Sequence, residues 1–432
     1  MKRLSILLLI YSFFTAFACT TESMAAGRVY LDITSPEARK IVFAIPPFQN
    51  SQEAKSQQLG RTLAQTLSLA LEFHGVIDVI SAKTPVGTSV ESWKASGADY
   101  AAVGRFTRSA DNISMEVRLF DVSTGDMLIG KSYKGTASQR DEMVFKFTDA
   151  VLKELTGKPG IATTQIAFVT QPADNQPKEI FITDILGRKM RQITRHNYIV
   201  VSPRFSRDGN YLAYSSFHSG NQNLYVTDLR QNKTTRSLSR RKGMNLGPGW
   251  SPDGRTLAVA LSFKGNPDLF LIDRRGEIIK QLTKKSGINV SAAFSPDGKY
   301  IVFVSDRSKK PQLYLMELAS GKTQRLTYKG TENAEPSWSP TENLIVYSSL
   351  RKGIYQICTI NPFQQDSTTQ VTSDRTHHES PSWSPDGNQI VFAKRDGRVN
   401  KIYGIMKNGS FQRVLFSLPG SQTYPQWASK NY

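Results

Sequence analysis

A motif repeated six times at nearly constant spacing governs the second half of this chain. In each copy an aromatic residue stands at the same place, and successive aromatics are 45, 44, 44, 45 and 44 residues apart. The six anchor aromatics are Phe205, Trp250, Phe294, Trp338, Trp383 and Trp427. The first five precede a turn sequence, which reads Ser-Pro-Asp-Gly in three copies. Proline presets φ, aspartate bonds the local backbone and glycine accepts a positive φ, so each turn predicts a hairpin between two strands.

Further strands follow each turn. Nine residues after the first five anchors lies the centre of a second strand, at Tyr214, Val259, Phe303, Tyr347 and Phe392. Third strands are predicted around 224–226, 269–271, 313–315, 354–356 and 402–404, and fourth strands end near 238–239, 282–283, 326–327 and 371–372. Four short strands in every 40–50 residues or so are the signature of a β-propeller blade.

The two ends of the repeat array complete each other. Segments 166–168, 180–182 and 193–194 resemble second, third and fourth strands without an anchor strand before them. At the other end, residues 424–427 form an anchor strand with nothing after it. Pairing the C-terminal strand with the first three removes the free edges of the ring. The sequence therefore predicts six blades, closed by the C-terminal strand.

Residues 28–156 show no repeat. Strands are expected at 41–45, 76–80 and 100–106, with a hairpin from 113 to 134. Apolar residues at helical spacing predict a helix over 59–73, and a last helix over 141–155 ends at Gly157. We therefore predict an α+β multidomain protein: an N-terminal α/β domain at 26–157, a linker at 158–161 and a six-bladed β-propeller at 162–432.

The first 25 residues are typical of a signal peptide. Lys2 and Arg3 precede an apolar stretch over 4–18, and Ser23-Met24-Ala25 fits a cleavage site. The apolar stretch is short for a membrane span, and no later stretch approaches one. We expect export to the periplasm, with the signal peptide cleaved and no transmembrane segment.

The two cysteines, Cys19 and Cys358, have different expected fates in the mature protein. Cys19 follows Ala16-Phe17-Ala18, an imperfect version of the small-residue box before a lipidated cysteine, so either lipidation or removal with the signal peptide remains open. After cleavage Cys358 is the remaining cysteine, so no intramolecular disulfide can form. We expect packing and strand closure to stabilise the mature protein.

The chain is strongly basic, with 55 Lys and Arg against 36 Asp and Glu and a formal net charge of +19. The basic residues are scattered, and the short runs are at 240–242 and 284–285. A nucleic-acid site usually concentrates its positive charge in one patch or stripe. We therefore expect no nucleic acid, and a solvated basic surface that favours acidic partners.

Three patterns that suggest chemistry are interpreted as structural. Residues 125–132 match a phosphate-binding loop, but that loop needs a following helix and here a strand is expected. His377-His378-Glu379 is expected to be a loop segment touching solvent or a partner, since adjacent side chains on an extended segment diverge. A Gly-x-Ser-x-Gly elbow of a hydrolase is missing from the sequence. We predict no catalytic residues, no cofactor and no metal.

The loops before the anchors repeat around one rim of the predicted disc, at 202–203, 245–248, 289–291, 333–336 and 377–380. Their prolines and glycines could merely shape the start of each strand. Loops on a rigid scaffold commonly carry binding function. For the ring of loops as a whole, we favour a binding surface.

Several segments resemble one known family. The anchors with their Ser-Pro-Asp-Gly turns and the final Tyr424-Pro425-Gln426-Trp427 resemble the propeller of the TolB family, periplasmic proteins of the Tol–Pal envelope system. Residues 28–33, 41–48 and 155–157 are similar to that family's N-terminal segment, first strand and last helix end. The resemblance spans nearly the whole mature chain.

The resemblance implies a non-enzymatic adaptor that supports outer-membrane integrity and cell division. It implies that the rim loops bind the lipoprotein Pal and that the mature N-terminal segment binds TolA, an inner-membrane protein. The implied Pal-facing residues are Ser202, Pro203, Asn245, Gly247, Ser291, Glu335 and Glu379. The implied TolA-facing residues are Arg28, Val29, Tyr30, Leu31, Asp32 and Ile33.

One departure from the family pattern concerns the third blade, where Val290-Ser291-Ala292 stands at the position at which family members have Thr-Glu-Pro. The pair Glu335-Pro336 occurs instead in the next blade. We hypothesise that residues 28–33 switch between docking on the body and extending to a partner, and we expect a monomer. The alternative is a periplasmic glycan-binding or hydrolytic β-propeller protein.

Overall fold

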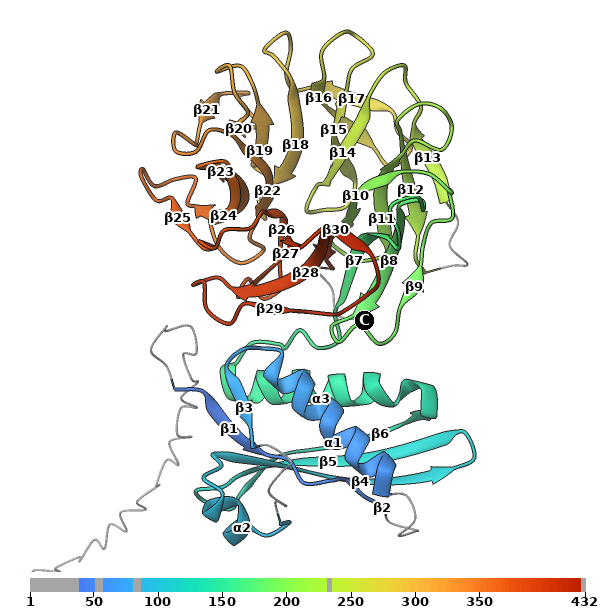
Figure 1. Cartoon of the computed structure of the whole chain (residues 1–432), viewed down its shortest axis with the longest axis vertical. Helices are drawn as coiled ribbons and strands as arrows, with labels where there is room; N and C mark the ends of the chain where they lie inside the picture. The colour runs from blue at the N-terminus through green and yellow to red at the C-terminus, as the bar shows by residue number, and fades with distance from the viewer. Residues whose placement is uncertain (1–38, 51–56, 81–86, 231–234, 429–432) are drawn as a thin grey trace, which may run out of the picture.

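The computed structural model describes residues 39–50, 57–80, 87–230 and 235–428. It consists of an N-terminal domain built on one sheet and a propeller of six sheets (Figure 1). The segment 28–33, predicted to bind TolA, lies outside the described residues. None of the helices in the described ranges is long and apolar enough to cross a membrane.

The N-terminal sheet mixes parallel and antiparallel pairing. Its strands follow the order β3-β1-β4-β5-β6, and β2 also pairs with β4. Their bounds are β1 (Ile41–Ala44), β2 (Gln49–Asn50), β3 (Ile77–Val79), β4 (Tyr100–Ser109), β5 (Asn112–Asp121) and β6 (Met127–Thr136). β1 runs parallel to β3 and β4, whereas β4, β5 and β6 are antiparallel. The predicted strands and hairpin are confirmed.

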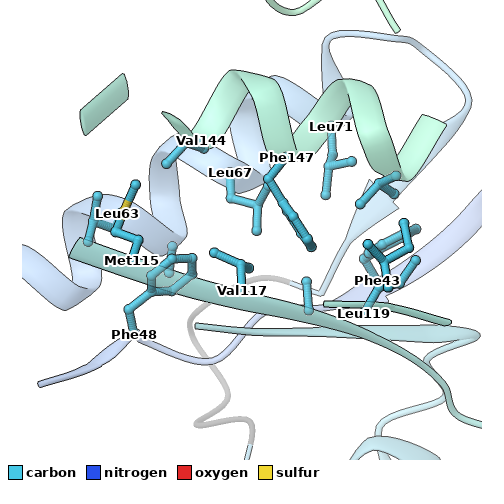
Figure 2. Close-up of a cluster of buried hydrophobic side chains, with 14 of the residues drawn as sticks. Phe43, Phe48, Leu63, Leu67, Leu71, Met115, Val117, Leu119, Val144 and Phe147 are labelled. Carbon is cyan, nitrogen blue, oxygen red and sulfur yellow. The ribbon is translucent and has the colours of Figure 1, made fainter. Parts of the chain in front are cut away.

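Two helices cover one face of this sheet. α1 (Gln57–Glu72) and α3 (Arg140–Thr156), which follows the 3-10 turn η2 (Ala137–Gln139), confirm both predicted helices. Figure 2 shows Leu63 and Leu67 of α1 and Phe147 of α3 packed against Met115 and Leu119 of the sheet. The apolar stripe of α1 is thus buried, which is how an amphipathic helix gains most of its stability.

A third helix was not predicted from the sequence. α2 (Val90–Ala95) is one short turn-and-a-half whose N-cap Ser89 accepts a hydrogen bond from the Ser92 amide at 3.3 Å. Its Trp93 packs with Ala44 and Ala101. Ala44 and Ala101 alternate along their strands with Phe43 and Ala102 of the main cluster, so α2 covers the opposite face of the sheet.

The propeller has six four-stranded antiparallel sheets, as predicted. Blade 1 is β10 (Val200–Phe205), β11 (Tyr211–Ser216), β12 (Asn223–Asp228) and β13 (Thr235–Ser239). Blade 2 is β14 (Asn245–Trp250), β15 (Thr256–Leu261), β16 (Asp268–Asp273) and β17 (Ile278–Gln281). Blade 3 is β18 (Asn289–Phe294), β19 (Tyr300–Ser305), β20 (Gln312–Glu317) and β21 (Thr323–Arg325).

The remaining blades follow the same plan. Blade 4 is β22 (Asn333–Trp338), β23 (Ile345–Arg351), β24 (Ile354–Ile360) and β25 (Thr369–Gln370). Blade 5 is β26 (His378–Trp383), β27 (Gln389–Asp396), β28 (Val399–Met406) and β29 (Arg413–Val414). Blade 6 is β30 (Ser421–Trp427), β7 (Gln165–Gln171), β8 (Glu179–Asp184) and β9 (Arg191–Gln192).

Blade 6 closes the ring from both ends of the array. β30 pairs antiparallel with β7, in a register that places Gln422 opposite Thr170 and Trp427 opposite Ile166. Figure 1 shows the red C-terminal strand β30 beside the green β7. The predicted closure by the C-terminal strand is confirmed.

The Ser-Pro-Asp-Gly turns have the predicted chemistry. In blade 2 the Ser251 hydroxyl donates to Asp253 at 2.6 Å and accepts from the Thr256 amide at 3.0 Å. Gly254 has a φ of 66°. The hydrogen bonds from Ser251 and from a backbone amide hold the pKa of Asp253 below its usual value. The aspartates of these turns are therefore explained by structure.

Two of the anchor tryptophans join neighbouring blades. The Trp250 indole Nε1 donates to the Arg204 carbonyl of blade 1, and the Trp383 Nε1 donates to the Ser337 carbonyl of blade 4, each at 3.1 Å. A large apolar ring with one buried donor can fill the space between two sheets and still pair its N–H. Cys358 of blade 4 is buried and free, and burial raises the pKa of its thiol to about 11.

The two domains share a hydrophobic cluster. Phe73 at the end of α1 and Phe145 of α3 pack with Phe168, Phe416 and Trp427 of the propeller. Further members from the segment between the domains are Ile161 and Ala162. A shared apolar cluster of this kind restricts motion between the domains.

Polar contacts reinforce the same junction. Arg413 donates to the Phe73 carbonyl at 2.6 Å and to Gln389 at 2.7 Å, and its guanidinium lies 4.7 Å from the Phe73 ring centre. Burial lowers the pKa of Arg413 to about 9. His74 is also buried; its Nδ1 contacts the Ala70 carbonyl at 2.9 Å and its Nε2 accepts from the Ile161 amide at 3.1 Å. These contacts fix the chain where it passes from one domain to the other.

Replacing the last anchor should weaken the closure. Trp427 is buried, donates its indole N–H to the Thr164 hydroxyl at 2.7 Å and packs edge-on against Phe73. Trp427→Ala should lower the free energy of unfolding by about 3–5 kcal/mol, the usual cost of removing a buried tryptophan. Urea unfolding monitored by circular dichroism measures this. The control Tyr328→Ala removes an aromatic that is 74% exposed and should change stability by less than about 0.5 kcal/mol. Equal effects of the two substitutions would contradict the closure role.

The buried histidine at the junction predicts a pH dependence. Burial lowers the pKa of His74 below its ordinary value of 6.5, so the folded protein holds the ring neutral while the unfolded chain takes up a proton below pH 6.5. Stability from this group is fully present above pH 6.5 and is lost as the pH falls, by up to about 1.4 kcal/mol per pH unit. His74→Gln keeps an acceptor but cannot titrate. Between pH 7 and pH 5, melting temperatures should fall less for this variant than for the unmodified protein, and parallel curves would refute the assignment.

Candidate partner-binding surface

The first strands of the six blades form the inner ring of the propeller. In Figure 1, β10, β14, β18, β22, β26 and β30 surround the centre, while the short fourth strands lie at the periphery. Each of the six contacts the first strands of both neighbouring blades. The approach is close: a Cβ on Gly249 would lie 2.3 Å from the Ala292 carbonyl oxygen of the next blade. The inner ring is therefore tightly packed around its whole circumference.

Every inner strand carries a β-bulge at the same place. Its pairing with the second strand shifts register between the residues four and one positions before the anchor. The residue three positions before the anchor has a φ between 50° and 63° in all six blades. These bulge residues are Ser202, Gly247, Ser291, Glu335, Ser380 and Tyr424.

Five of the six bulge residues are not glycine. A positive φ is uncommon for such residues, and strained conformations cost on the order of 1–3 kcal/mol and cluster at functional sites. Bulges likewise concentrate where a side chain must be aimed away from the regular pleat. A positive φ repeated in all six blades, and strained in five of them, indicates that the inner strands present a particular surface as well as forming the inner ring.

The two faces of the propeller differ. Connections from first to second strands and from third to fourth strands lie on one face, here called the turn face; the other connections lie on the opposite face, here called the loop face. The N-terminal domain contacts Gln389, Arg413 and Trp427, all at strand ends on the turn face. The beginnings of the six inner strands lie at the loop face.

The structure places four predicted residues at equivalent sites. Ser202, Gly247, Ser291 and Glu335 are bulge residues, half-buried in the inner ring of blades 1 to 4. Glu379 precedes the bulge residue of blade 5 and is also half-buried. Sequence reasoning placed Ser380 in a rim loop but named neither Ser380 nor Tyr424 as a partner-facing residue, although counting back three residues from each anchor would have found both. Pro203 follows the bulge of blade 1 and is buried.

Asn245 has a structural role in the ring. Its exposed fraction is 0%, and its amide donates to the carbonyls of Gln222 and Arg241, at 2.9 and 2.7 Å. Its carbonyl oxygen accepts from the Ser239 hydroxyl at 2.5 Å. Asn245 is therefore a buried polar latch between the end of blade 1 and the start of blade 2, and its side chain is not accessible to a partner.

The same latch recurs in other blades. In blade 3, Thr327 donates to Gln312 at 2.9 Å, and Asn333 of blade 4 donates to the same Gln312 oxygen at 2.8 Å. Asp268 and Thr283 of blade 2 are joined to Asn289 of blade 3 in the same manner. Hydrogen bonds between buried polar groups help to define a unique geometry. The latches therefore tie the loop-face connections to the blades beneath them.

His378 stands at the latch position of blade 5. The sequence analysis expected a histidine that touches solvent or a partner, but the exposed fraction of His378 is 0%. Its Nε2 lies 3.3 Å from Asp374, and burial lowers the pKa of the imidazole. The expectation was wrong for His378 because the segment starts strand β26 instead of forming an exposed loop. His377, its neighbour, is half-buried.

Glu335 bridges two blades across the inner ring. Its carboxylate accepts from the Ser380 amide at 2.6 Å, the Ser380 hydroxyl at 2.8 Å and the Ser348 hydroxyl at 3.0 Å. Burial, followed by the charge of Glu335, raises the pKa of Glu379. Burial and the charges of Glu335 and Glu379 raise the pKa of Tyr424 to about 12. Blades 4 and 5 thus place two carboxylates close enough to affect one another.

Blades 1 to 3 present an apolar arc on the same face. Six residues before their anchors stand Ile199, Met244 and Ile288, which are 43%, 37% and 44% exposed. Tyr198 beside Ile199 is 53% exposed. In blades 4 to 6 the same position is polar: Glu332, His377 and Ser421. Sequence reasoning missed this arc, although the spacing from the anchors was sufficient to find it.

The segment that matches a phosphate-binding loop is a hairpin. Asp121 accepts from the Ser123 amide at 2.8 Å, Gly125 has a φ of 83°, and the rest of the match lies in strand β6. No helix N-terminus follows the glycine, so the backbone amides needed for phosphate are not assembled. The hairpin and strand predicted for this segment are confirmed.

Comparisons with known proteins give a consistent result. The TolB beta propeller domain family matches residues 152–431, and the TolB amino-terminal domain family matches residues 29–128. The chain is 56% identical over 408 residues to the Tol-Pal system protein TolB of Desulfotalea psychrophila, covering 94% of this chain and 93% of that protein. It is 36% identical over 229 residues to the Tol-Pal system protein TolB of Desulfosudis oleivorans, covering 50% and 52% of the two chains.

A solved structure supports the same conclusion. The crystal structure of TolB from Acinetobacter baumannii is similar, with a TM-score of 0.80 and 27% sequence identity, over 90% of this chain and 97% of that one. The chain belongs to the TolB family, a non-enzymatic component of the Tol–Pal system.

Proposed function

We propose that this protein is an exported, monomeric adaptor of the Tol–Pal system that binds Pal through the loop face and TolA through residues 28–33. In this role it supports outer-membrane integrity and cell division from the periplasm. Membership of the TolB family supports the assignment to the Tol–Pal system. The basic and apolar stretches of residues 1–25 support export. We further propose the domain division 26–157, 158–161 and 162–432.

The observation that carries the Pal proposal is the pairing of an apolar arc with a carboxylate pair on one rigid ring. Ile199, Met244 and Ile288 lie on blades 1 to 3, and Glu335 and Glu379 on blades 4 and 5. Exposed apolar side chains rimmed by polar groups are typical of protein interaction sites. Such a face fits a partner segment with an apolar half and a basic half.

The bulges contribute by holding the face in place before the partner arrives. The bulge residues of neighbouring blades approach one another: a Cβ on Gly247 would lie 3.5 Å from the Ser291 amide, and Ser380 donates to Glu335. A surface already ordered in the free protein loses less entropy on binding, so more of its contact energy appears as affinity. We propose direct contacts by Ser202, Gly247, Ser291, Glu335 and Glu379, with Pro203 and Asn245 supporting the surface from behind.

The TolA proposal concerns the mature N-terminal segment. Residues 28–33 alternate apolar and polar side chains and precede β1, which begins at Ile41. A short alternating segment can add to the edge of a partner's sheet by main-chain hydrogen bonds. We propose that this segment alternates between the body of the protein and TolA.

A charge placed in the apolar arc should weaken Pal binding. Ile199→Asp puts a carboxylate among side chains that would be desolvated in the complex. We expect the Kd for purified Pal from the same organism to rise at least about tenfold, the size expected for an interface hot spot. Isothermal titration calorimetry measures the change. Met244→Asp, assayed separately, keeps the test informative if Ile199→Asp lowers the melting temperature.

The matched control is Ile279→Asp. Ile279 is 56% exposed on the outer strand β17, away from the inner ring, so the same chemical change should leave the Kd within about twofold. Wild-type affinity in both folded arc variants would rule out the loop face as the Pal site.

Removal of the N-terminal segment should separate the two interactions. A mature protein lacking residues 28–33 should lose TolA binding in a pull-down and keep a measurable affinity for Pal, because the loop face is built from other residues. Equal loss of both interactions, in a variant with an unchanged circular dichroism spectrum, would contradict the assignment of the segment to TolA.

A further inference from the structure

Two histidines that are distant in sequence meet on the loop face of blade 1. His196 lies between β9 and β10, His218 lies between β11 and β12, and their ring centres are 4.0 Å apart with planes inclined by 54°. His218 is exposed and His196 is half-buried. The pair is therefore open to small solutes from solvent. Sequence reasoning considered only the adjacent histidines of blade 5 and expected no metal site.

A single hydroxyl orients both rings. The Ser216 Oγ lies 2.7 Å from His196 Nδ1 and 3.0 Å from His218 Nδ1. A hydroxyl oxygen has two acceptor lone pairs, so it can accept from both Nδ1–H groups. In that tautomer each Nε2 carries a lone pair that is available to a cation. Metal-binding histidines in proteins are commonly held by a hydrogen bond from the other ring nitrogen.

Oxygen donors lie next to both Nε2 atoms. The Tyr214 hydroxyl is 3.5 Å from His196 Nε2, and the Tyr225 hydroxyl is 3.5 Å from His218 Nε2. Tyr214 and Tyr225 are paired across β11 and β12, so they belong to the rigid part of the blade. At 3.5 Å these contacts are at the weak limit of hydrogen bonding. Little would be lost if either Nε2 turned from the phenol to a cation.

The loop that carries His196 is anchored from below. The buried Glu179 accepts from the Asn197 amide at 2.7 Å and from the Thr194 hydroxyl. His218 stands on the separate connection after β11, where its own amide contacts Ser216. One ion bound by both imidazoles would tie two loop-face connections together, next to the apolar arc at Tyr198 and Ile199.

We propose that His196 and His218 form a binding site for a divalent transition cation such as Zn²⁺, with water or a neighbouring hydroxyl in the remaining positions. Imidazole nitrogen is a preferred ligand of Zn²⁺, at about 2.0–2.1 Å. The described residues contain no group of three or more His, Cys, Asp and Glu side chains that could hold a metal. With two protein ligands, the site binds its ion reversibly.

The test uses the full mature chain without an affinity tag, freed of metal with a chelator. Zn²⁺ is titrated at neutral pH by isothermal titration calorimetry, and Co²⁺ serves as a spectroscopic probe because nitrogen ligation changes its visible absorption. We expect one equivalent of saturable binding, a rise in melting temperature with Zn²⁺, and a Co²⁺ spectrum typical of imidazole ligation.

Substitutions assign the ligands. His196→Ala and His218→Ala should each weaken Zn²⁺ binding at least tenfold and abolish the zinc-dependent rise in melting temperature. His377→Ala, on the same face but in blade 5, should bind like the unmodified protein. The proposal is overturned if the unmodified protein shows no saturable binding, or if it binds Zn²⁺ no more tightly than both ligand variants. Because the readouts use metal alone, failure here leaves the Pal and TolA proposals standing.

Discussion

The antiparallel pairing of β30 with β7 is the interaction on which the rest of this structure depends. It joins the last strand of the propeller to the propeller's first strand in the sequence, so that the sixth blade is complete and the six sheets form a closed ring. Trp427 contributes to both contacts of this strand: it pairs with Ile166 of β7, and its ring packs against Phe73 of the N-terminal domain. One short strand therefore closes the propeller and docks the domain that precedes it.

Closure makes a repeated surface possible. In a ring, each inner strand is held by two neighbours, so a strained φ at the same position of every blade can be tolerated. The Asn and Thr latches fix the loop-face connections from beneath. The side chains on the loop face differ between blades: blades 1 to 3 carry Ile199, Met244 and Ile288, and blades 4 and 5 carry Glu335 and Glu379. The backbone therefore repeats six times, whereas the side chains on the loop face do not.

Much of the fold could be predicted because the repeat depends on residues that are close in the sequence. Each Ser-Pro-Asp-Gly segment favours one turn geometry, and the spacing of the anchors then gives the number of blades. The short helix α2 was missed because six residues give no helical period, and its main support, Trp93 against the far side of the sheet, is tertiary. His378 was misjudged for a related reason: whether a residue starts a strand or ends a loop depends on its pairing with the next strand.

The candidate surface was predicted as a region but less well residue by residue. Four of the named residues share the bulge position, which the spacing implied. Asn245 is two positions earlier, where its hydrogen bonds hold the side chain inward. The meeting of His196 with His218 depends on how two loops fold over β11, which no spacing in the sequence encodes.

Hydrogen–deuterium exchange with and without Pal tests the central claim most directly, namely that the closed ring presents a preformed partner surface on its loop face. The account predicts slower exchange on binding in the loop-face segments around 198–202, 244–247, 288–291, 335 and 379–380, with the turn face and the outer strands unchanged. Protection confined to the turn face or to the outer strands would contradict it.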